Sequence, residues 1–255
     1  MQDPIDAAAP AGPTAIVVGA SGGLGGALVD ALLARGAFGT VLALARTPSA
    51  PVPSGAPAAR VVRGTIDVED EASVAAAAAL ARTLPRPRLV LVASGLLHAA
   101  DGLRPEKSLA QLDPARLARL FAVNAIGPAL VAKHFVPAMP RDGRVVFAAL
   151  SARVGSLSDN RLGGWYGYRA SKAALNMLLR CTAIEWTRTA RDSVCVGLHP
   201  GTVDTALSAP FRGGVADSRL FSPARSAAHL LDVIDRLGPA DTGRVFAWDG
   251  TEVPA

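Results

Sequence analysis

The chain has 255 residues, of which half are apolar and 5% aromatic, and its formal net charge is +5. This length and apolar content fit one large α/β domain with a sizeable core. No apolar run reaches the roughly 18 residues of a membrane span. The arginines are spread along the chain and aromatic residues are few, which argues against nucleic acid as a partner.

The two cysteines, Cys181 and Cys195, have the spacing of neither a metal site nor a disulfide framework. We therefore expect two buried, reduced thiols in a cytoplasm and no bound metal. Because no apolar run has the length of a membrane span, we also expect a soluble protein that does not enter a membrane. Residues 1–13 lack the basic and apolar regions of a signal peptide, and we expect them to form a disordered tail. Residues 14–255 are predicted to form a single Rossmann-type domain.

Seven apolar runs have the length of strands, and five longer segments between them have helical patterns. The runs are unbroken rather than alternating, which is typical of parallel strands buried on both faces. The predicted strands are 14–20, 40–45, 59–64, 88–94, 143–150, 193–199 and 243–248, and the predicted helical segments are 24–36, 69–83, 108–139, 168–189 and 222–238. This order predicts an α/β, doubly wound Rossmann fold: a mostly parallel seven-stranded sheet with helices on both faces.

Two local features refine these elements. Ser222 and Pro223 are expected to be the N-cap and first residue of the last helix, and Gly238 to close it. The segment TPSAPVPSGAPAA (47–59) is rich in proline and small residues but lies between two predicted strands. It is therefore interpreted as a surface loop and not as a domain boundary.

The first predicted strand runs directly into the glycine-rich turn GASGGLG (19–25) and then into a helix. Gly19 permits a tight turn, while Gly23 and Gly25 let the backbone approach a pyrophosphate and let helix and strand pack closely. A plain strand-to-helix turn is the alternative. After the second predicted strand, Arg46 stands where an acidic residue would bind a ribose 2′-hydroxyl, which favours a 2′-phosphate unless Arg46 is an ordinary surface arginine.

The segment YRASK places Tyr168 four residues before Lys172, in a chain with 23 arginines and only three lysines. On a helix these two side chains share a face. A neighbouring ammonium favours the phenolate form, so we expect Lys172 to lower the pKa of Tyr168 and make it a general acid. An ordinary surface contact between the two residues is the alternative.

Four motifs together resemble the short-chain dehydrogenase/reductase superfamily over nearly the whole chain: GASGGLG, VNAIGP (123–128), YRASK and HPGTVDT (199–205). More narrowly, SARVGSLSDNRLGGWYGYRASKAALN and the ending FAWDGTEVPA resemble its C-factor-like, sniffer-like and carbonyl-reductase-like branch. The resemblance implies metal-free hydride transfer between a nicotinamide cofactor and a carbonyl or alcohol. Arg46, with no acidic residue after the second predicted strand, favours NADP(H) over NAD(H) as that cofactor.

The resemblance also implies roles for individual residues. Tyr168 would protonate the carbonyl oxygen, Lys172 would hold the ribose hydroxyls, and Asn124 would hold a water of the proton relay. Asp67 and Val68 match positions that contact adenine, and Val203 and Thr205 match positions that contact the carboxamide. The remaining expected cofactor contacts are the turn residues Gly19, Ser21, Gly23, Leu24 and Gly25, with Arg46, Gly95, Pro200 and Gly201.

Two departures from the family pattern stand out. The fourth strand is followed by VASG (92–95), which keeps only Gly95 of the usual Asn-Asn-Ala-Gly turn. The active-site serine is usually the second of a pair, a position that falls on Ala152 here. Ser151 would serve only if the backbone shifted by one residue, because neighbouring strand residues face opposite ways. Ser151 is predicted to take the role, with Ser156 as the alternative.

The sequence thus favours a carbonyl reductase or alcohol dehydrogenase. The alternative is a dinucleotide-binding signalling or regulatory protein of the C-factor type with little turnover. The pocket loops, 95–107, 152–164 and 206–221, favour a small or apolar carbonyl substrate. The long helices expected around 108–138 and 168–189 carry apolar stripes. The family resemblance implies that such helices pair into a homodimer or homotetramer, with a monomer as the alternative.

Overall fold

The computed structural model describes residues 12–47, 60–211 and 219–255. Nearly all of the predicted N-terminal tail and of the predicted surface loop at 47–59 lies outside these residues. The seven strands form one sheet in the order β3-β2-β1-β4-β5-β6-β9, and every pair in it is parallel. They are β1 (Thr14–Val18), β2 (Thr40–Ala45), β3 (Arg60–Thr65), β4 (Pro87–Val92), β5 (Val145–Leu150), β6 (Ser193–His199) and β9 (Val245–Ala247). The predicted doubly wound Rossmann fold is confirmed.

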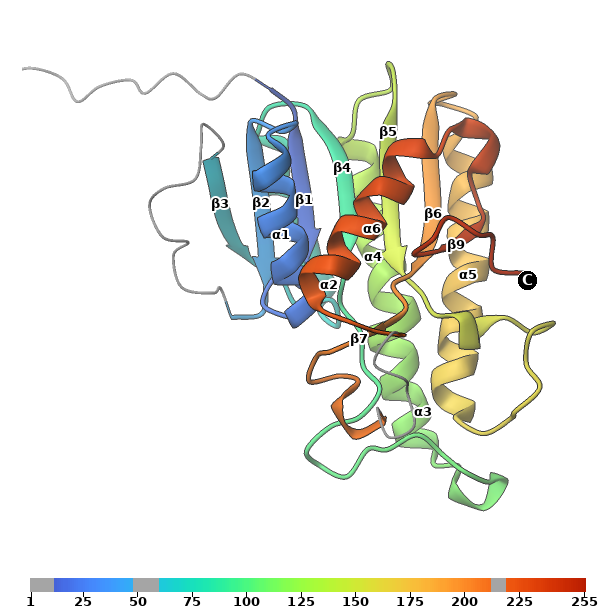
Figure 1. Ribbon diagram of the computed structural model, residues 1–255. Coiled ribbons are helices and arrows are strands. Elements are labelled where there is room, and N and C mark those ends of the chain that lie inside the picture. The colour runs from blue at the N-terminus through green and yellow to red at the C-terminus, as the bar shows by residue number, and fades with distance from the viewer. Residues whose placement is uncertain (1–11, 48–59, 212–218) are drawn as a thin grey trace, which may run out of the picture.

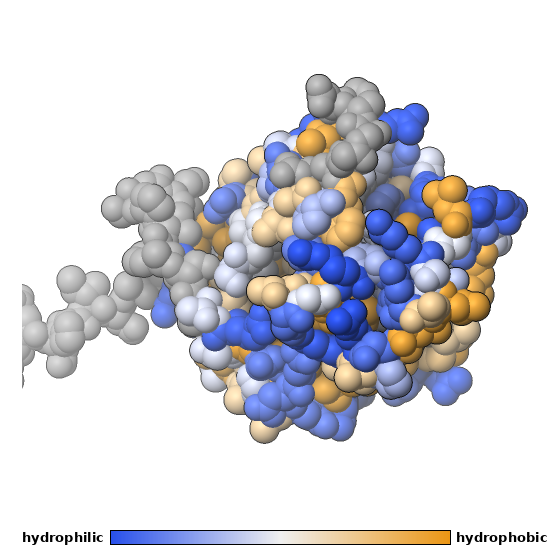
Figure 2. Space-filling model, turned by 90° about the horizontal axis from the view of Figure 1, so that it is seen from below, coloured by the Kyte–Doolittle hydropathy of each residue, from blue (hydrophilic) through white to orange (hydrophobic). Residues whose placement is uncertain are grey.

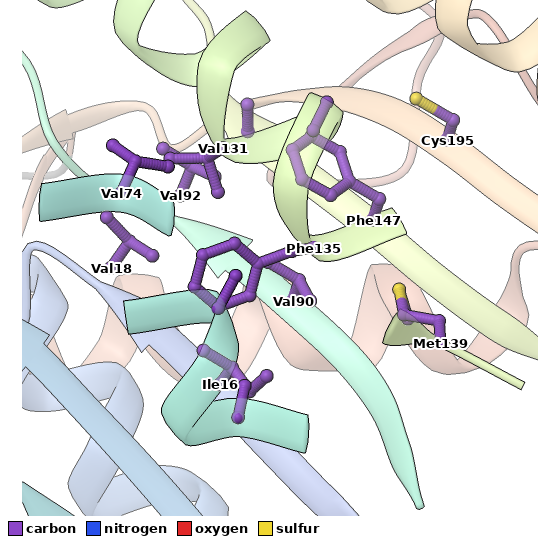
Figure 3. Packing of buried hydrophobic residues seen from close by; sticks show 14 of the residues in the cluster. Ile16, Val18, Val74, Val90, Val92, Val131, Phe135, Met139, Phe147 and Cys195 are labelled. Carbon is purple, nitrogen blue, oxygen red and sulfur yellow. The ribbon is translucent and has the colours of Figure 1, made fainter. Parts of the chain in front are cut away.

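Helices cover both faces of this sheet (Figure 1). On one face lie α1 (Gly23–Arg35) and α6 (Pro223–Arg236), and on the other lie α2 (Glu71–Arg82), α4 (Gly127–Phe135) and α5 (Tyr166–Trp186). Successive strand residues point to opposite faces, so alternate residues feed two separate cores. In β1, Ile16 and Val18 pack on the side of Phe135 and Phe147 (Figure 3), whereas Ala15 and Val17 pack on the side of α1.

Short polar side chains define where several helices begin. Asp70 accepts from the Ala72 amide at the start of α2, and Ser222 accepts from the Arg225 amide at the start of α6, as its predicted N-cap role requires. Helix α6 stops at Arg236 with Leu237 as its cap, so Gly238 stands directly after the cap, where a glycine that closes a helix is expected.

The prediction of two buried thiols is confirmed for Cys195 of β6 and is wrong for Cys181 of α5, which is exposed.

The predicted helical segment 108–139 is not one helix. A short 3-10 turn is followed by α3 (Pro114–Phe121), a π-helical turn (Ala122–Ile126), α4 and a second 3-10 turn. Asp113 caps α3 and Pro114 fills its first position. Pro128 lacks an amide hydrogen, so the carbonyl of Asn124 has no α-helical partner there, which is consistent with the change of helix type. By length and composition alone, Pro114–Ala138 could cross a membrane, but its inner face packs on the sheet.

One small element was not predicted, a two-stranded parallel pairing of β7 (Thr202–Val203) with β8 (Leu220–Phe221). Strands of two residues carry no periodic pattern that could be recognised. The pairing brings Thr202–Val203, shortly after β6, beside Leu220–Phe221, directly before α6. At the carboxyl edge of the main sheet the strand order reverses between β1 and β4, which is where doubly wound sheets bind ligands.

Candidate active site

A cavity of about 210 Å³ opens at this reversal point. Figure 2 views the molecule from this side, and hydrophilic side chains run across the middle of the face. Six of the predicted cofactor contacts line the cavity: Gly19, Ser21, Arg46, Asp67, Val68 and Gly95. The structure therefore brings together residues from the ends of β1, β2, β3 and β4.

The glycine-rich turn is folded too tightly for side chains at two of its positions. Gly19 has φ 88°, and its amide donates to the Leu44 carbonyl at 2.8 Å. A Cβ on Gly25 would lie 2.1 Å from the Gly19 oxygen, so helix α1 packs directly against the turn. Leu24 points its side chain into the core, so only its backbone faces the turn.

Replacing Gly25 with Ala is expected to weaken NADPH binding by about tenfold or more, since relieving an overpacked contact costs on the order of 1–3 kcal/mol and displaces the turn. Fluorescence titration of NADPH measures the effect. Gly26→Ala is the matched control, because its added Cβ would lie 3.4 Å from the nearest atom, an ordinary contact. Equal affinities for the two variants would contradict the assignment of this turn.

The cavity suits a nucleotide. No side chain caps the amides at the start of α1, whose positive end can receive phosphate. Ser94 lines the cavity, and its buried hydroxyl has no hydrogen-bond partner among the described residues. Arg46 is exposed directly after β2. The Asp67 carboxylate accepts from the Glu69 amide at 3.1 Å and so shapes the adjoining turn.

The predicted carboxamide side of the site meets the glycine turn. A Cβ on Gly23 would lie 3.0 Å from Cγ2 of Thr205, so the segment after β6 lies against the start of α1. Gly201 has φ 77° and packs its backbone against Phe221, and the Pro200 carbonyl accepts from the Ser226 hydroxyl at 2.8 Å. Val203 is buried in the core below α1.

Tyr168 and Lys172 lie together in the first two turns of α5. The Lys172 Nζ atom is 5.8 Å from the centre of the Tyr168 ring and donates to the Leu150 carbonyl at 2.7 Å. Both side chains are buried, with exposed fractions of 8% and 3%. A Cβ on Gly95 would be 3.9 Å from Nζ, so the pair sits next to the cavity.

The protonation of this pair differs from the expectation. Burial raises the pKa of the Tyr168 phenol to about 12 and lowers the pKa of the Lys172 ammonium to about 8. Loss of solvent disfavours the charged form of each group and outweighs the attraction of the ammonium for a phenolate. Tyr168 therefore holds its proton at neutral pH, which suits a proton donor.

Asn124 is completely buried and holds the loop after β4 against α5. Its Oδ1 accepts from the Leu96 amide at 2.8 Å, and its Nδ2 donates to the Leu96 carbonyl at 2.8 Å and to the Ser171 hydroxyl at 3.1 Å. Ser171 in turn donates to the carbonyl of Tyr168 at 2.9 Å. Two hydrogen bonds through the Ser171 hydroxyl thus connect the Asn124 side chain to the backbone of Tyr168.

The two candidate serines are both buried and both engaged. The Ser151 hydroxyl donates to Oδ1 of Asn176 at 2.6 Å, and its amide continues the strand ladder by donating to Leu198. The backbone shift that Ser151 would need is absent, because β5 and β6 pair in unbroken register. Ala152 packs with Tyr168 instead. Ser156 donates to the backbone oxygen of Ala255 at 3.4 Å.

Several residues around the site were not predicted from the sequence. Glu69 and Arg119 line the cavity, and Arg119 is paired with Asp101. The Trp165 ring packs edge-on against Tyr168 and against Phe211, at centroid distances of 6.2 and 5.1 Å. WYGY beside the reactive pair was the available signal for Trp165, whereas the position of Phe211 depends on a loop whose conformation no local pattern encodes.

Comparison with known proteins agrees with this geometry. The family model described as short chain dehydrogenase matches residues 13–215, so the chain belongs to the short-chain dehydrogenase/reductase family of oxidoreductases. The predicted family and branch are confirmed.

Three relatives illustrate the match. The chain is 40% identical over 147 residues to the C-signal of Myxococcus xanthus, covering 58% of this chain and 83% of that protein. It is 33% identical over 240 residues to 1-hydroxy-2-glutathionyl-2-methyl-3-butene dehydrogenase of Rhodococcus sp., covering 93% and 97%. The crystal structure of NADPH-bound carbonyl reductase from chicken fatty liver superposes with a TM-score of 0.79 at 26% identity, covering 96% and 99%.

Proposed function

We propose that this protein is an NADP(H)-dependent oxidoreductase that interconverts a carbonyl compound and its alcohol. The observation that carries the proposal is the buried Tyr168–Lys172 pair beside Gly95, at the edge of a cavity that the glycine turn and Arg46 line. The NADPH-bound carbonyl reductase with the same fold supports the choice of cofactor. The complete set of Tyr168, Lys172 and Asn124 favours an enzyme over a regulatory protein.

Each group has a defined task in this proposal. Bound nicotinamide supplies or accepts the hydride. In the reducing direction Tyr168 donates its proton to the carbonyl oxygen of the substrate. Lys172 offers two further ammonium protons to ribose hydroxyls while it holds the Leu150 carbonyl. The side chain of Asn124 keeps the loop after β4 in place. The backbone carbonyl of Asn124 has no α-helical partner, because Pro128 lacks an amide hydrogen, and it can hold the water that resupplies the proton.

The remaining cofactor contacts have supporting roles. Turn residues 19–25 receive the pyrophosphate, while Asp67, Val68 and Gly95 form the adenine side. Pro200, Gly201, Val203 and Thr205 form the carboxamide side. Trp165, Phe211 and Leu97 make an apolar wall beside Tyr168, which fits a small or apolar carbonyl substrate.

Turnover of a substrate panel tests the proposal directly. Oxidation of NADPH and NADH is followed at 340 nm, a wavelength set by the nicotinamide, with aldehydes, ketones and quinones as substrates. We expect NADPH oxidation that depends on the carbonyl compound and is faster than NADH oxidation. An absence of turnover with every carbonyl and, in reverse, with every alcohol would contradict an enzymatic role.

The cofactor preference is expected to depend on Arg46. Its guanidinium can pair with a 2′-phosphate, a charge-assisted contact that NADH does not offer. Arg46→Asp should weaken NADPH binding by about tenfold or more and reverse the preference toward NADH, since hydrogen bonds to charged groups contribute roughly 1.5–3 kcal/mol. Fluorescence titration of both cofactors measures this. The control is Arg60→Asp at the exposed start of β3; equal or tighter NADH binding by the unaltered protein would contradict the proposal.

Ser151 remains the proposed hydroxyl that bonds the substrate oxygen, which requires the backbone after β5 to shift by one residue so that Ser151 leaves Asn176 and faces Tyr168. Ser151→Ala should then lower kcat by about a hundredfold, as loss of such a donor does elsewhere. Ser156→Ala is the comparison. A large loss only in Ser156→Ala would move the role there. Rates near those of the unaltered protein in both variants would mean that the site works without a serine, with Ala152 beside the phenol.

We further propose a cytoplasmic protein that assembles into a homodimer or homotetramer through the helical segments 108–138 and 168–189. Apolar side chains exposed along them support this: Ile126 is 52%, Met177 64% and Ile184 48% exposed. Sedimentation equilibrium distinguishes these assemblies from a monomer.

A further inference from the structure

We propose that Glu106 is a positioning residue whose buried carboxylate caps α5 from outside the helix and thereby holds Tyr168 and Trp165 in place. The exposed fraction of Glu106 is 3%, and it is the only acidic residue among the buried polar residues of the described chain. It lies in the loop between β4 and α3, and no step of the proposed reaction uses it.

Helix α5 lacks the side-chain cap that α2, α3 and α6 have at their first turns. Asp70, Asp113 and Ser222 each precede their own helix and accept one of its first amides. The residue at this position of α5 is Trp165, whose side chain makes no cap hydrogen bond. The first amides of a helix have no acceptor within it, so α5 needs one from elsewhere.

Glu106 provides that acceptor although it lies 61 residues away in sequence. The Gly167 amide, in the first turn of α5, donates to Oε2 of Glu106 at 3.1 Å. The amide of Trp165 donates to the Glu106 backbone carbonyl at 2.5 Å. A carboxylate at this end of a helix is also favoured by the positive end of the helix dipole.

The fit is close because position 167 has no side chain. A Cβ on Gly167 would lie 3.0 Å from Oε1 of Glu106, and 2.7 and 2.9 Å from the side chains of Leu120 and Leu117. The carboxylate is therefore clamped between α3 and the backbone that directly precedes Tyr168.

The same contacts hold an uncommon backbone conformation. Gly163, Gly164 and Trp165 follow one another with φ of 62°, 64° and 52°. Such values are rare for a residue other than glycine, and they persist where surrounding contacts enforce them. Glu106 holds the Trp165 end of this turn, and Nε of Arg169 donates to the Gly164 carbonyl at 3.0 Å. This conformation sets the Trp165 ring edge-on against Tyr168.

Three substitutions separate the carboxylate's hydrogen bond from its charge and size. Glu106→Gln keeps an acceptor oxygen at the same reach, Glu106→Asp withdraws it by one methylene, and Glu106→Ala removes it. We expect Glu106→Ala and Glu106→Asp to lower kcat by about 10- to 100-fold, the effect of a misplacement of about 1 Å, with the Kd of NADPH unchanged. Glu106→Gln should keep kcat within a few-fold of the unaltered protein. Glu185→Ala is the control, because Glu185 is an exposed glutamate on α5.

The kinetic effect rests on the proposed function, whereas amide hydrogen exchange does not. NMR exchange should show the Gly167 amide protected in the unaltered protein and in Glu106→Gln, and rapidly exchanging in Glu106→Ala and Glu106→Asp, with amides of the sheet unchanged. An unprotected Gly167 amide in the unaltered protein would overturn the inference, and so would protection that survives in both Glu106→Ala and Glu106→Asp. A kcat of Glu106→Gln as low as that of Glu106→Ala would overturn it as well. If no variant turns over any substrate but the exchange pattern holds, the proposed function fails and the capping role stands.

Discussion

Replacement of Tyr168 by Phe is expected to lower kcat by about a hundred- to ten-thousandfold, the range for loss of a general acid. NADPH binding should stay within about twofold, because the variant loses only a hydroxyl while the ring keeps its packing against Ala152 and Leu97. Steady-state kinetics with a substrate from the panel, together with a fluorescence titration of NADPH, measures both quantities.

The matched control is Tyr166→Phe. Tyr166 begins α5 and lies two positions earlier, about 200° round the helix from Tyr168. It should keep most of its turnover. If instead Tyr168→Phe retains the rate of the unaltered protein, another group donates the proton and the regulatory alternative gains support.

Replacement of Lys172 by Ala is expected to damage both turnover and cofactor binding. The ammonium is assigned to ribose hydroxyls and to the phenol, and it also satisfies the Leu150 carbonyl at the end of β5. Losing hydrogen bonds to a charged group should weaken NADPH binding by about tenfold or more. Losing its electrostatic support of the proton transfer should lower kcat by about a hundredfold or more.

Titration of NADPH and turnover of the same protein sample separate the two effects. Lys133→Ala is the control, since the Lys133 side chain is 62% exposed and its ammonium pairs with Glu71 of α2. A Lys172→Ala variant that binds NADPH normally would remove the ribose role, and one that turns over normally would remove the role in proton transfer.

Local patterns account for what the sequence could predict. Unbroken apolar runs such as TAIVV mark buried parallel strands, and the spacing of Tyr168 and Lys172 fixes their common face without knowledge of the rest of the fold. The glycine turn was recognisable because its requirement is steric and local, as the contact of Gly25 with the Gly19 oxygen shows.

What could not be predicted depends on contacts between distant segments. Burial, which raises the pKa of Tyr168 and lowers that of Lys172, is a property of the assembled layers. The division of 108–139 into several helices was marked by Pro114 and Pro128, but the overall apolar pattern hid it. The cap of α5 comes from Glu106, and no pattern near Trp165 points to a carboxylate so far away.

The two cores of the sheet separate the supports of the two halves of the site. Leu175 and Leu179 of α5 belong to the core on one face of the sheet, and Leu28 and Leu32 of α1 belong to the core on the other face. Alternate residues of each strand contribute to these two cores. In β5, Phe147 belongs to the core that α5 helps to form, and its neighbour Ala148 belongs to the core that α1 helps to form. A single substitution in one strand can therefore change the packing beneath either the Tyr168–Lys172 pair or the glycine turn without changing the other. This separation allows descendants of this chain to acquire new substrates while the nucleotide-binding turn stays unaltered.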